Sequence, residues 1–332
     1  MTPAQSAIGV EFADAGLEQS VRAGLDAVEE LLRSSVRTDD EFIAEAARYL
    51  VDAGGKRFRP LMTVLAAHFG DASAPNVVPS AVVVELTHLA TLYHDDVMDE
   101  ASVRRGAPSA NARWDNTIAI LTGDFLFSRA SDLLADLGPA AVRLQARTFE
   151  RLVTGQIRET VGPRSGDDPI EHYLGVLGEK TGSLIATAAE FGARFAGVDE
   201  RVVEILRRFG ERIGVAFQIS DDILDVASDS AESGKTPGTD LREGVATLPV
   251  LYALRSPSSS PRLRELVSHP LVDDAEHAEA LALLRASTAL DEARATVRQY
   301  ADAARGMLAE LPDVAARAGF AALTDRVIDR TG

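Results

Sequence analysis

The chain has 332 residues, 46% of them hydrophobic and 26% charged, a composition typical of a globular protein. A formal net charge of −17 disfavours binding to nucleic acid or to anionic lipid, because phosphate groups would be repelled. The absence of cysteine excludes disulfides and thiolate-bound metals.

The sequence offers no targeting or membrane segment that we can recognise. Its first residues lack a basic stretch followed by an apolar one, and no apolar run approaches the ~18 residues that span a bilayer. We therefore predict a cytoplasmic protein without a membrane span.

Hydrophobic residues recur at intervals of three and four through most of the chain, which predicts helices. The first stripe lies in residues 17–36 and comprises Leu17, Val21, Leu25, Val28, Leu31 and Leu32. Further stripes follow at 60–69, 81–98, 117–135, 141–159, 174–195, 202–226, 246–254 and 276–309. Segments rich in Gly, Pro and Ser separate them, at 70–75, 104–109, 136–139, 161–169, 233–238 and 255–261. Only 76–84 is ambiguous with a strand, so we predict one all-α domain covering residues 1–332.

Two acidic motifs lie near the ends of predicted helices, in "YHDDVMDE" (93–100) and "DDILD" (221–225). Residues four apart share a helix face, so Asp95 and Asp99 point together, with Asp96 beside them. Asp221, Asp222 and Asp225 repeat the arrangement. Such carboxylates repel one another and the helix C-terminus disfavours them further, which suggests a functional site. Dense carboxylate oxygens suit Mg²⁺ together with substrate phosphates. A solvated acidic helix end is the alternative for either motif alone.

Basic residues recur between and beside the acidic motifs. They are Lys56, Arg57 and Arg59 in "GGKRFRP", Arg104 and Arg105 in "VRRG", Lys180 in "EKTG" and Lys235 in "SGKTPG". Arginine and lysine match phosphate oxygens, which predicts diphosphate binding. The spacing of a Walker A loop and the G-x-G-x-x-G pattern are both absent.

The motifs "GGKRFRP", "HDDVMDEASVRRG", "GEKTGSL", "FQISDDILD" and "GKTPGTDLREG", in this order, resemble those of the trans-prenyltransferases, the polyprenyl and geranylgeranyl diphosphate synthases. The resemblance covers about residues 40–255. It implies an isoprenoid-synthase helical bundle around a deep cavity, usually a homodimer. It also implies condensation of isopentenyl diphosphate with an allylic diphosphate, with Mg²⁺, about three ions per site, or Mn²⁺ in its place.

The resemblance also assigns residues to roles. The predicted metal ligands are Asp95, Asp96, Asp99, Asp221, Asp222 and Asp225. Arg104, Lys180 and Lys235 are predicted to hold the allylic diphosphate, and Lys56, Arg59, His88 and Arg105 the isopentenyl diphosphate, with Arg57 a weaker member of that group. Thr181 and Gln218 match positions near the reacting carbons, so the predicted catalytic set is Asp95, Asp96, Lys180, Thr181 and Gln218. We expect His94 to be a half-buried structural histidine.

Two positions depart from the family pattern. Glu159 in "GQIRE" replaces a common Asp, and Val245 stands near a position where the family often has a second lysine. Val245 would remove one diphosphate contact, which leaves open the reading of a non-catalytic partner subunit.

Residues before the first motif predict product length. Ala90 and Thr91 are small at positions where family members that make short products tend to have aromatic residues. Leu86 and Thr87 lie one helical turn earlier in the sequence. We therefore expect a medium- or long-chain product of the type used for quinone side chains. Geranylgeranyl diphosphate, with twenty carbons, is the alternative product. A terpene cyclase is less favoured, because "DDILD" does not match the second cyclase motif and aromatic residues are only 5% of the chain.

Overall fold

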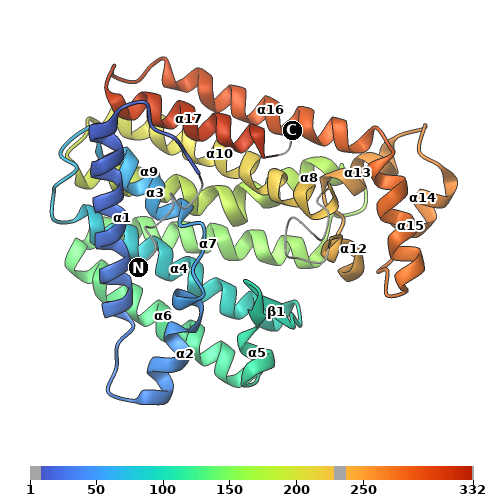
Figure 1. Cartoon of the computed structure of the whole chain (residues 1–332), viewed down its shortest axis with the longest axis horizontal. Coiled ribbons are helices and arrows are strands. Elements are labelled where there is room, and N and C mark those ends of the chain that lie inside the picture. Colours follow the sequence, from blue (N-terminus) through green and yellow to red (C-terminus); the bar gives the residue numbers. More distant parts are fainter. Residues whose placement is uncertain (1–8, 228–236, 331–332) are drawn as a thin grey trace. The chain divides into compact units, whose positions relative to one another are not determined.

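A computed structural model describes residues 9–227 and 237–330 of the chain (Figure 1). Within these ranges the structure is almost wholly helical, which confirms the predicted all-α class. The described strands form a single hairpin, in which β1 (Val103–Arg104) pairs antiparallel with β2 (Ala107–Pro108) and Val103 lies opposite Pro108.

The first half of the chain contains the helices α1 (Ala15–Ser35), α2 (Glu41–Asp52), α3 (Phe58–Ala67), α4 (Val77–Met98), α5 (Ala110–Arg113), α6 (Asn116–Leu137) and α7 (Pro139–Val161). The second half contains α8 (Pro169–Leu177), the π-helical turn η1 (Gly178–Gly182), α9 (Ser183–Phe195), α10 (Glu200–Ala227), α12 (Thr239–Glu243), α13 (Leu248–Arg255), α14 (Pro261–Leu266), α15 (Asp274–Arg285), α16 (Ala289–Leu308) and α17 (Ala315–Asp329).

Aspartate residues define where several of these helices begin. A carboxylate placed just before a helix accepts hydrogen bonds from the first backbone N–H groups, which lack partners inside the helix. Helices α1, α2, α6, α8 and α15 start in this way, after Asp14, Asp40, Asp115, Asp168 and Asp273. These residues therefore account for part of the high acidic content without any role in chemistry.

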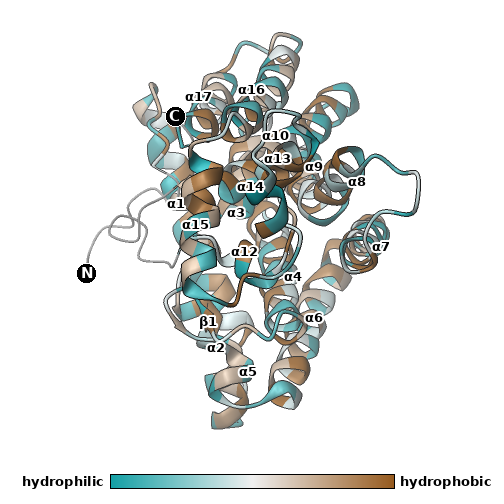
Figure 2. Cartoon of the chain, turned by 90° about the vertical axis from the view of Figure 1, so that its right-hand side faces the viewer, coloured by the Kyte–Doolittle hydropathy of each residue, from teal (hydrophilic) through white to brown (hydrophobic). Residues whose placement is uncertain are grey.

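The chain separates into two compact units. Unit 1 comprises residues 1–149, 184–210 and 310–322, and its core surrounds α4, which packs against α1, α3 and α6. Because α4 has neighbours on several sides, it is buried around most of its circumference and shows little amphipathic character. Helix α1 carries hydrophobic and hydrophilic residues together, as a helix at a surface does (Figure 2).

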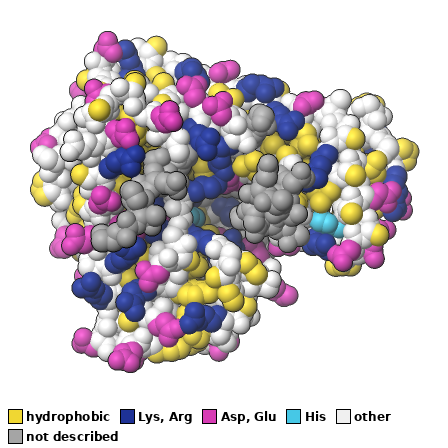
Figure 3. Space-filling view, in the orientation of Figure 1, with side chains coloured by type: hydrophobic (Ala, Val, Ile, Leu, Met, Phe, Trp, Pro, Cys, Tyr) yellow, Lys and Arg dark blue, Asp and Glu magenta, His cyan; other side chains and the backbone are white. Residues whose placement is uncertain are grey.

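Unit 2 comprises residues 150–183, 211–309 and 323–332. Within it, α13 packs against α16 and α8, and α14 against α15. Figure 3 shows acidic and basic side chains interspersed on the visible surface, with hydrophobic side chains among them over α14 and α15. The prediction of one domain stays a prediction, since the contacts within the chain divide it into these two units.

Most predicted helices are found close to their expected bounds, and the ambiguous segment 76–84 belongs to α4. Two predicted helices are interrupted. Segment 174–195 contains the π-helical turn between α8 and α9, and segment 276–309 is divided between α15 and α16. Helices α2, α5, α12, α14 and α17 were not predicted.

Candidate active site

The first acidic motif lies where α4 ends. Asp99 occupies the position after the last helical residue, and Asp95 precedes it by one turn. Asp96 is instead fully buried, and its Oδ1 accepts a hydrogen bond of 2.5 Å from Nε of Arg104. Burial raises the pKa of Asp96, although Arg104 opposes this shift. The motif thus divides, with Asp95 and Asp99 toward the surface and Asp96 turned inward to orient Arg104.

The loop "GGKRFRP" adopts a backbone that most residues disfavour. Gly54 and Gly55 have φ of +79° and +149°, and Arg57 has φ of +48° just before α3. A Cβ atom added to Gly55 would lie 2.9 Å from Nη2 of Arg105, so glycine allows this guanidinium to lie against the loop. Arg105 Nη1 donates to the carbonyl oxygens of Leu50, at 2.6 Å, and Gly54.

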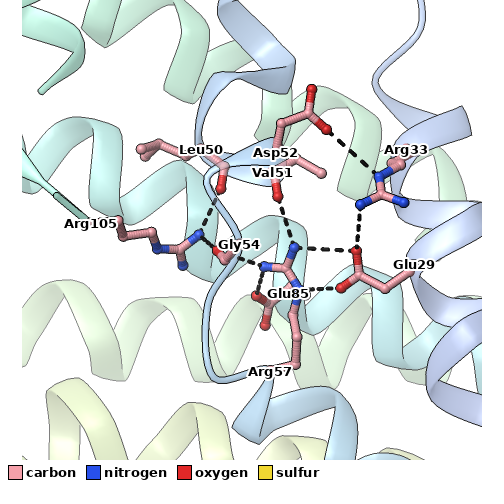
Figure 4. Close-up of polar contacts among 9 residues, drawn as sticks. All are labelled: Glu29, Arg33, Leu50, Val51, Asp52, Gly54, Arg57, Glu85 and Arg105. Atoms are coloured by element: carbon pink, nitrogen blue, oxygen red, sulfur yellow. Dashed lines mark hydrogen bonds and ion pairs between the residues drawn. The ribbon is translucent and has the colours of Figure 1, made fainter. Parts of the chain in front are cut away.

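Arg57 is buried, and carboxylate and carbonyl oxygens of the protein surround its guanidinium group (Figure 4). It pairs with Glu29 of α1 and with Glu85 of α4, and it donates to two backbone carbonyl groups at the end of α2. The predicted contact between Arg57 and isopentenyl diphosphate is untested, but these interactions do not favour it.

His88 lies on α4 in a strongly cationic environment. Burial, followed by the charges of Arg59, Arg105, Arg57 and Arg104, lowers the pKa of His88 well below its usual range. The imidazole is therefore neutral near pH 7 and can donate one hydrogen bond without adding charge. This convergence of predicted substrate-binding residues within unit 1 suits an anionic ligand such as a diphosphate.

The second acidic motif lies in the last turns of α10, in unit 2. Gln218 donates from Nε2 to Oδ1 of Asp222 at 3.0 Å, and the hydroxyl of Tyr173 donates to Oδ2. Thr181 completes the chain through a 3.2 Å hydrogen bond from Oγ1 to Oε1 of Gln218. Burial raises the pKa of Asp222 to about 6, while the two hydrogen bonds oppose the shift. Thr181, Gln218 and Asp222 are thus joined by hydrogen bonds within unit 2.

The two remaining carboxylates of this motif differ in their surroundings. Asp221 pairs with Arg330 near the chain end, and that guanidinium lies 4.7 Å from the ring centre of Phe217. Asp225 accepts hydrogen bonds of 3.3 Å from the backbone N–H groups of Thr239 and Asp240. Asp225 therefore anchors the start of α12, next to the segment that contains Lys235.

The π-helical turn η1 presents Lys180 and Thr181. Such turns insert an extra residue into a helix and are frequent at functional sites. Lys180 Nζ lies 2.5 Å from Oε2 of Glu159 on α7. Gly155 makes this approach feasible, because a Cβ atom there would lie 2.8 Å from the backbone nitrogen of Lys180. Glu159, which stands where the family often has Asp, is therefore the ion-pair partner of Lys180, the residue predicted to bind the allylic diphosphate.

The residues predicted to limit product length lie along α4. Leu86, Thr87 and Ala90 are buried within unit 1, and Thr91 is half-buried. Thr87 accepts a 2.7 Å hydrogen bond from Gln145. His94 is half-buried, with Nε2 3.1 Å from the carbonyl oxygen of Ile120, which agrees with its predicted structural role.

Two further predicted features flank α12 in the sequence. Lys235 lies outside the described residues. Val245 is 42% exposed just after α12, so a lysine at this position would have access to solvent.

Sequence reasoning missed several residues that support the site, namely Glu29, Glu85, Tyr173, Asp240 and Arg330. Tyr173 and Arg330 lie far in sequence from the carboxylates that they contact. Glu85 offered a weak signal, because it is the only Asp, Glu, Lys or Arg of α4 before the acidic motif.

The residues present fit Mg²⁺ by their chemistry. Both motifs supply hard carboxylate oxygens, although no three acidic or histidine side chains within the described ranges are close enough to hold an ion by themselves. Mg²⁺ keeps several waters and is usually bound by one or two carboxylates plus substrate phosphates, so such a closed cluster is not required. Within unit 1, Asp95 and Asp99 are more accessible than the buried Asp96. Within unit 2, Asp222 is buried, Asp221 is half-buried and paired with Arg330, and Asp225 accepts hydrogen bonds from backbone N–H groups.

An all-α fold, acidic helix ends, basic residues near His88 and a π-helical turn bearing lysine and threonine are the features expected of a protein that binds organic diphosphates with the help of divalent cations. Within residues 9–227 and 237–330, no helix combines the length and apolar character needed to cross a membrane.

Comparison with known proteins identifies the family. A family model described as polyprenyl synthetase matches residues 40–284, and the chain therefore belongs to the polyprenyl synthetase family. It is a prenyltransferase.

The chain is 54% identical to nonaprenyl diphosphate synthase of Mycobacterium tuberculosis, over 100% of this chain and 99% of that protein. It is 40% identical to heptaprenyl diphosphate synthase component 2 of Geobacillus stearothermophilus, over 87% of this chain and 90% of that protein. The crystal structure of geranylgeranyl pyrophosphate synthase from Corynebacterium glutamicum, complexed with calcium and isoprenyl diphosphate, has a TM-score of 0.85 and 47% identity, covering 97% of this chain and 100% of that chain. The terpene cyclase alternative is not supported.

Proposed function

We propose that the chain is an all-trans polyprenyl diphosphate synthase that condenses isopentenyl diphosphate with an allylic diphosphate to give a medium- or long-chain product. The observation that carries this proposal is the 54% identity to a nonaprenyl diphosphate synthase over the whole chain, together with small residues at Ala90 and Thr91. A twenty-carbon product is the second candidate, because a structural relative is a geranylgeranyl pyrophosphate synthase.

The reaction needs positive charge more than a protein base. As the allylic C–O bond breaks, negative charge develops on the leaving diphosphate, and cationic groups stabilise it. Bound Mg²⁺ would supply most of this charge neutralisation. Asp95, Asp99 and Asp221 are the proposed principal ligands, while Asp96, Asp222 and Asp225 orient the groups around them. Arg104, Lys180 and Lys235 add charge for the allylic diphosphate.

We assign isopentenyl diphosphate to the basic residues of unit 1 that lie in the loop "GGKRFRP" and in "VRRG", together with His88. Lys56, Arg59 and Arg105 provide charge, and neutral His88 provides a hydrogen bond. The double bond of this substrate attacks the allylic carbon, and loss of a proton then restores neutrality at the new double bond. Thr181 and Gln218 are proposed to lie near the reacting carbons. The leaving diphosphate is the proposed acceptor of this proton, so the mechanism requires no dedicated histidine base.

We further propose that the enzyme uses Mg²⁺, functions as a homodimer and is cytoplasmic. A hydrophobic strip at the start of α6 supports association, because the adjacent residues Ile120 and Leu121 are both more than 40% exposed. A heteromeric enzyme is the alternative, since one relative is named as a component of a synthase.

The product distribution tests the proposal. The purified chain is incubated with farnesyl diphosphate, excess isopentenyl diphosphate and Mg²⁺, and the products are identified by mass after dephosphorylation. Products well beyond twenty carbons support the medium- or long-chain assignment, whereas termination at twenty supports the alternative. No product from the chain alone would contradict the homomeric enzyme and favour the partner-subunit reading suggested by Val245.

A further inference from the structure

A buried ion-pair network joins the loop "GGKRFRP" to the helix that carries the first acidic motif. Glu85 lies on α4, ten residues before Asp95, and is only 2% exposed. Its Oε1 lies 2.9 Å from Nη1 of Arg57, which is itself 8% exposed. A carboxylate and a guanidinium so deeply buried are costly to desolvate unless they satisfy one another.

Arg57 is held from several directions. Its Nε donates to Glu29 of α1, its Nη2 donates to Val51 O at 3.0 Å, and its Nη1 reaches Gly54 O at 3.3 Å (Figure 4). Burial lowers the pKa of Arg57, but the charges of Glu85 and Glu29 outweigh this and raise it overall. The charge of Arg57 is therefore already balanced by protein carboxylates, which leaves little attraction for a substrate phosphate.

The same loop is bound by a second arginine. Arg105 Nη1 donates to Gly54 O and Leu50 O, so the two guanidinium groups share the Gly54 carbonyl. Lys56 and Arg59 lie on either side of Arg57 in sequence, and His88 lies less than one turn after Glu85 on α4. The Arg57–Glu85 pair thus fixes the loop and its basic residues against α4, close to the histidine.

We infer that Glu85, Glu29 and Arg57 are positioning residues that set the binding geometry of isopentenyl diphosphate. This inference rests on the proposed assignment of that substrate to Lys56, Arg59 and His88. Displacing a binding group by about 1 Å can reduce catalytic efficiency by orders of magnitude, so loss of this support should be visible in substrate binding.

The test compares conservative variants of the network in steady-state kinetics, with each substrate varied at saturating concentration of the other. Glu85→Gln and Glu29→Gln keep side-chain size while removing charge. Arg57→Lys keeps charge but cannot reach two carboxylates and two carbonyl groups at once. We expect the KM for isopentenyl diphosphate to rise about tenfold in Glu85→Gln and Arg57→Lys, with the KM for the allylic diphosphate changed by less than about twofold.

Two further variants calibrate the result. Glu190→Gln removes another buried carboxylate of unit 1, paired with Arg194 at 2.7 Å and distant in sequence from the loop, and should leave both KM values unchanged. Lys56→Ala removes a proposed ligand directly and should raise only the KM for isopentenyl diphosphate. If Glu85→Gln fails to fold, Glu29→Gln, whose side chain is 27% exposed, and Arg57→Lys give the same comparison.

Three outcomes would overturn the inference. Unchanged KM values in the network variants, with an effect in Lys56→Ala, would make the network purely structural. An effect of Arg57→Lys without any effect of the two glutamine variants would make Arg57 a direct ligand. No effect of Lys56→Ala would show that the proposed location of isopentenyl diphosphate is wrong, and the inference with it, even if product still forms.

Discussion

The aspartates of each motif are chemically equivalent in sequence but differ in their surroundings. Asp96 is buried against Arg104, and Asp222 is buried against Tyr173 and Gln218. Asp95, Asp99 and Asp221 lie in more accessible positions. Because a carboxylate loses hydration on burial, the inner members need donors in place of water. They can therefore orient neighbouring side chains, while the outer members remain the proposed oxygen ligands of Mg²⁺.

The raised pKa of Asp222 predicts the pH dependence of stability. Burial moves the pKa of this carboxyl from 3.8 to about 6. A carboxyl with a raised folded-state pKa destabilises the folded protein above that pKa, and the penalty disappears as the pH falls toward 3.8. We therefore expect Asp222→Asn to stabilise the metal-free protein by about 1–3 kcal/mol at pH 7–8, with little difference near pH 4. Denaturant unfolding with a chelator, across this pH range, measures the effect.

Asp39→Asn provides the control for this measurement, because Asp39 is exposed and lies in the other unit. It should give no comparable change. A destabilising effect of Asp222→Asn at pH 8 would mean that the two hydrogen bonds outweigh burial, and our account of the raised pKa would be wrong.

The hydroxyl of Tyr173 is predicted to hold the Asp222 carboxylate in the orientation that the proposed Mg²⁺ site needs. Tyr173→Phe removes one of the two side-chain donors to this carboxylate and should cost about 1 kcal/mol of unfolding free energy. It should also increase the Mg²⁺ concentration needed for half-maximal rate, since the carboxylate loses orientation. A Mg²⁺ titration of the rate, alongside thermal unfolding, separates the two effects. A variant that loses stability with an unchanged Mg²⁺ requirement would reduce Tyr173 to a packing role.

At the scale of elements, the position of Lys180 depends on the close approach of α7 to the π-helical turn. Gly155→Ala would place Cβ 2.8 Å from the backbone nitrogen of Lys180 and 2.9 Å from Cβ of Glu179. Neither atom is at the end of a flexible side chain, so the turn itself must move. We expect a loss of about 1–3 kcal/mol in stability and a lower kcat. Circular dichroism melts and steady-state assays measure both.

Gly306→Ala is the matched control, because Gly306 also lies in a helix of unit 2 and no atom lies within 4 Å of an added Cβ. Alanine should there be neutral or stabilising by up to about 1 kcal/mol. Equal behaviour of the two variants would show that α7 and the turn do not need to approach so closely.

The elements also show what could be predicted from sequence. Asp95 and Asp99 were recognised because their relation is local, four residues along one helix. The ion pairs of Arg57 could not be predicted for the opposite reason, since its carboxylate partners each lie 28 residues away, on different helices. The turn at 178–182 was hidden because hydrophobic periodicity does not distinguish a π-helical insertion from a regular helix. Local spacing thus revealed the chemistry, whereas the supporting contacts required the tertiary structure.

At the scale of the whole molecule, ligand binding should increase stability by mass action. A ligand that binds only the folded state contributes about 2.7 kcal/mol at one hundred times its dissociation constant. We expect Mg²⁺ with inorganic diphosphate to raise Tm by more than the sum of the two added singly, because each lowers the charge repulsion of the other. Thermal unfolding with and without chelator measures this increase in Tm. The double variant Asp95→Asn, Asp99→Asn is the comparison, because it removes two of the proposed metal ligands. Additive shifts would argue against a shared metal and diphosphate site.

The outer face of α6 gives the last prediction. The inner face of this helix packs on α4 through Ala119, Thr122, Gly123 and Leu126, so Leu121, which is 57% exposed, is not needed for the core of unit 1. In the proposed homodimer, this leucine and its neighbour Ile120 would contact the second copy of the chain. Leu121→Glu should therefore convert a dimer into a monomer while helical content is retained.

Val272→Glu supplies the comparison, because Val272 is 85% exposed but lies in unit 2, away from α6 in sequence. Both variants add the same charge to an exposed hydrophobic position, so they differ only in which surface is altered. Light scattering after size-exclusion chromatography should report a monomer for Leu121→Glu and a dimer for Val272→Glu. If the chain without substitutions is itself a monomer, the homodimer proposal is contradicted. The hydrophobic strip on α6 would then be a surface for the second component of a heteromeric synthase, and mixing with that component, rather than self-association, would restore chain elongation.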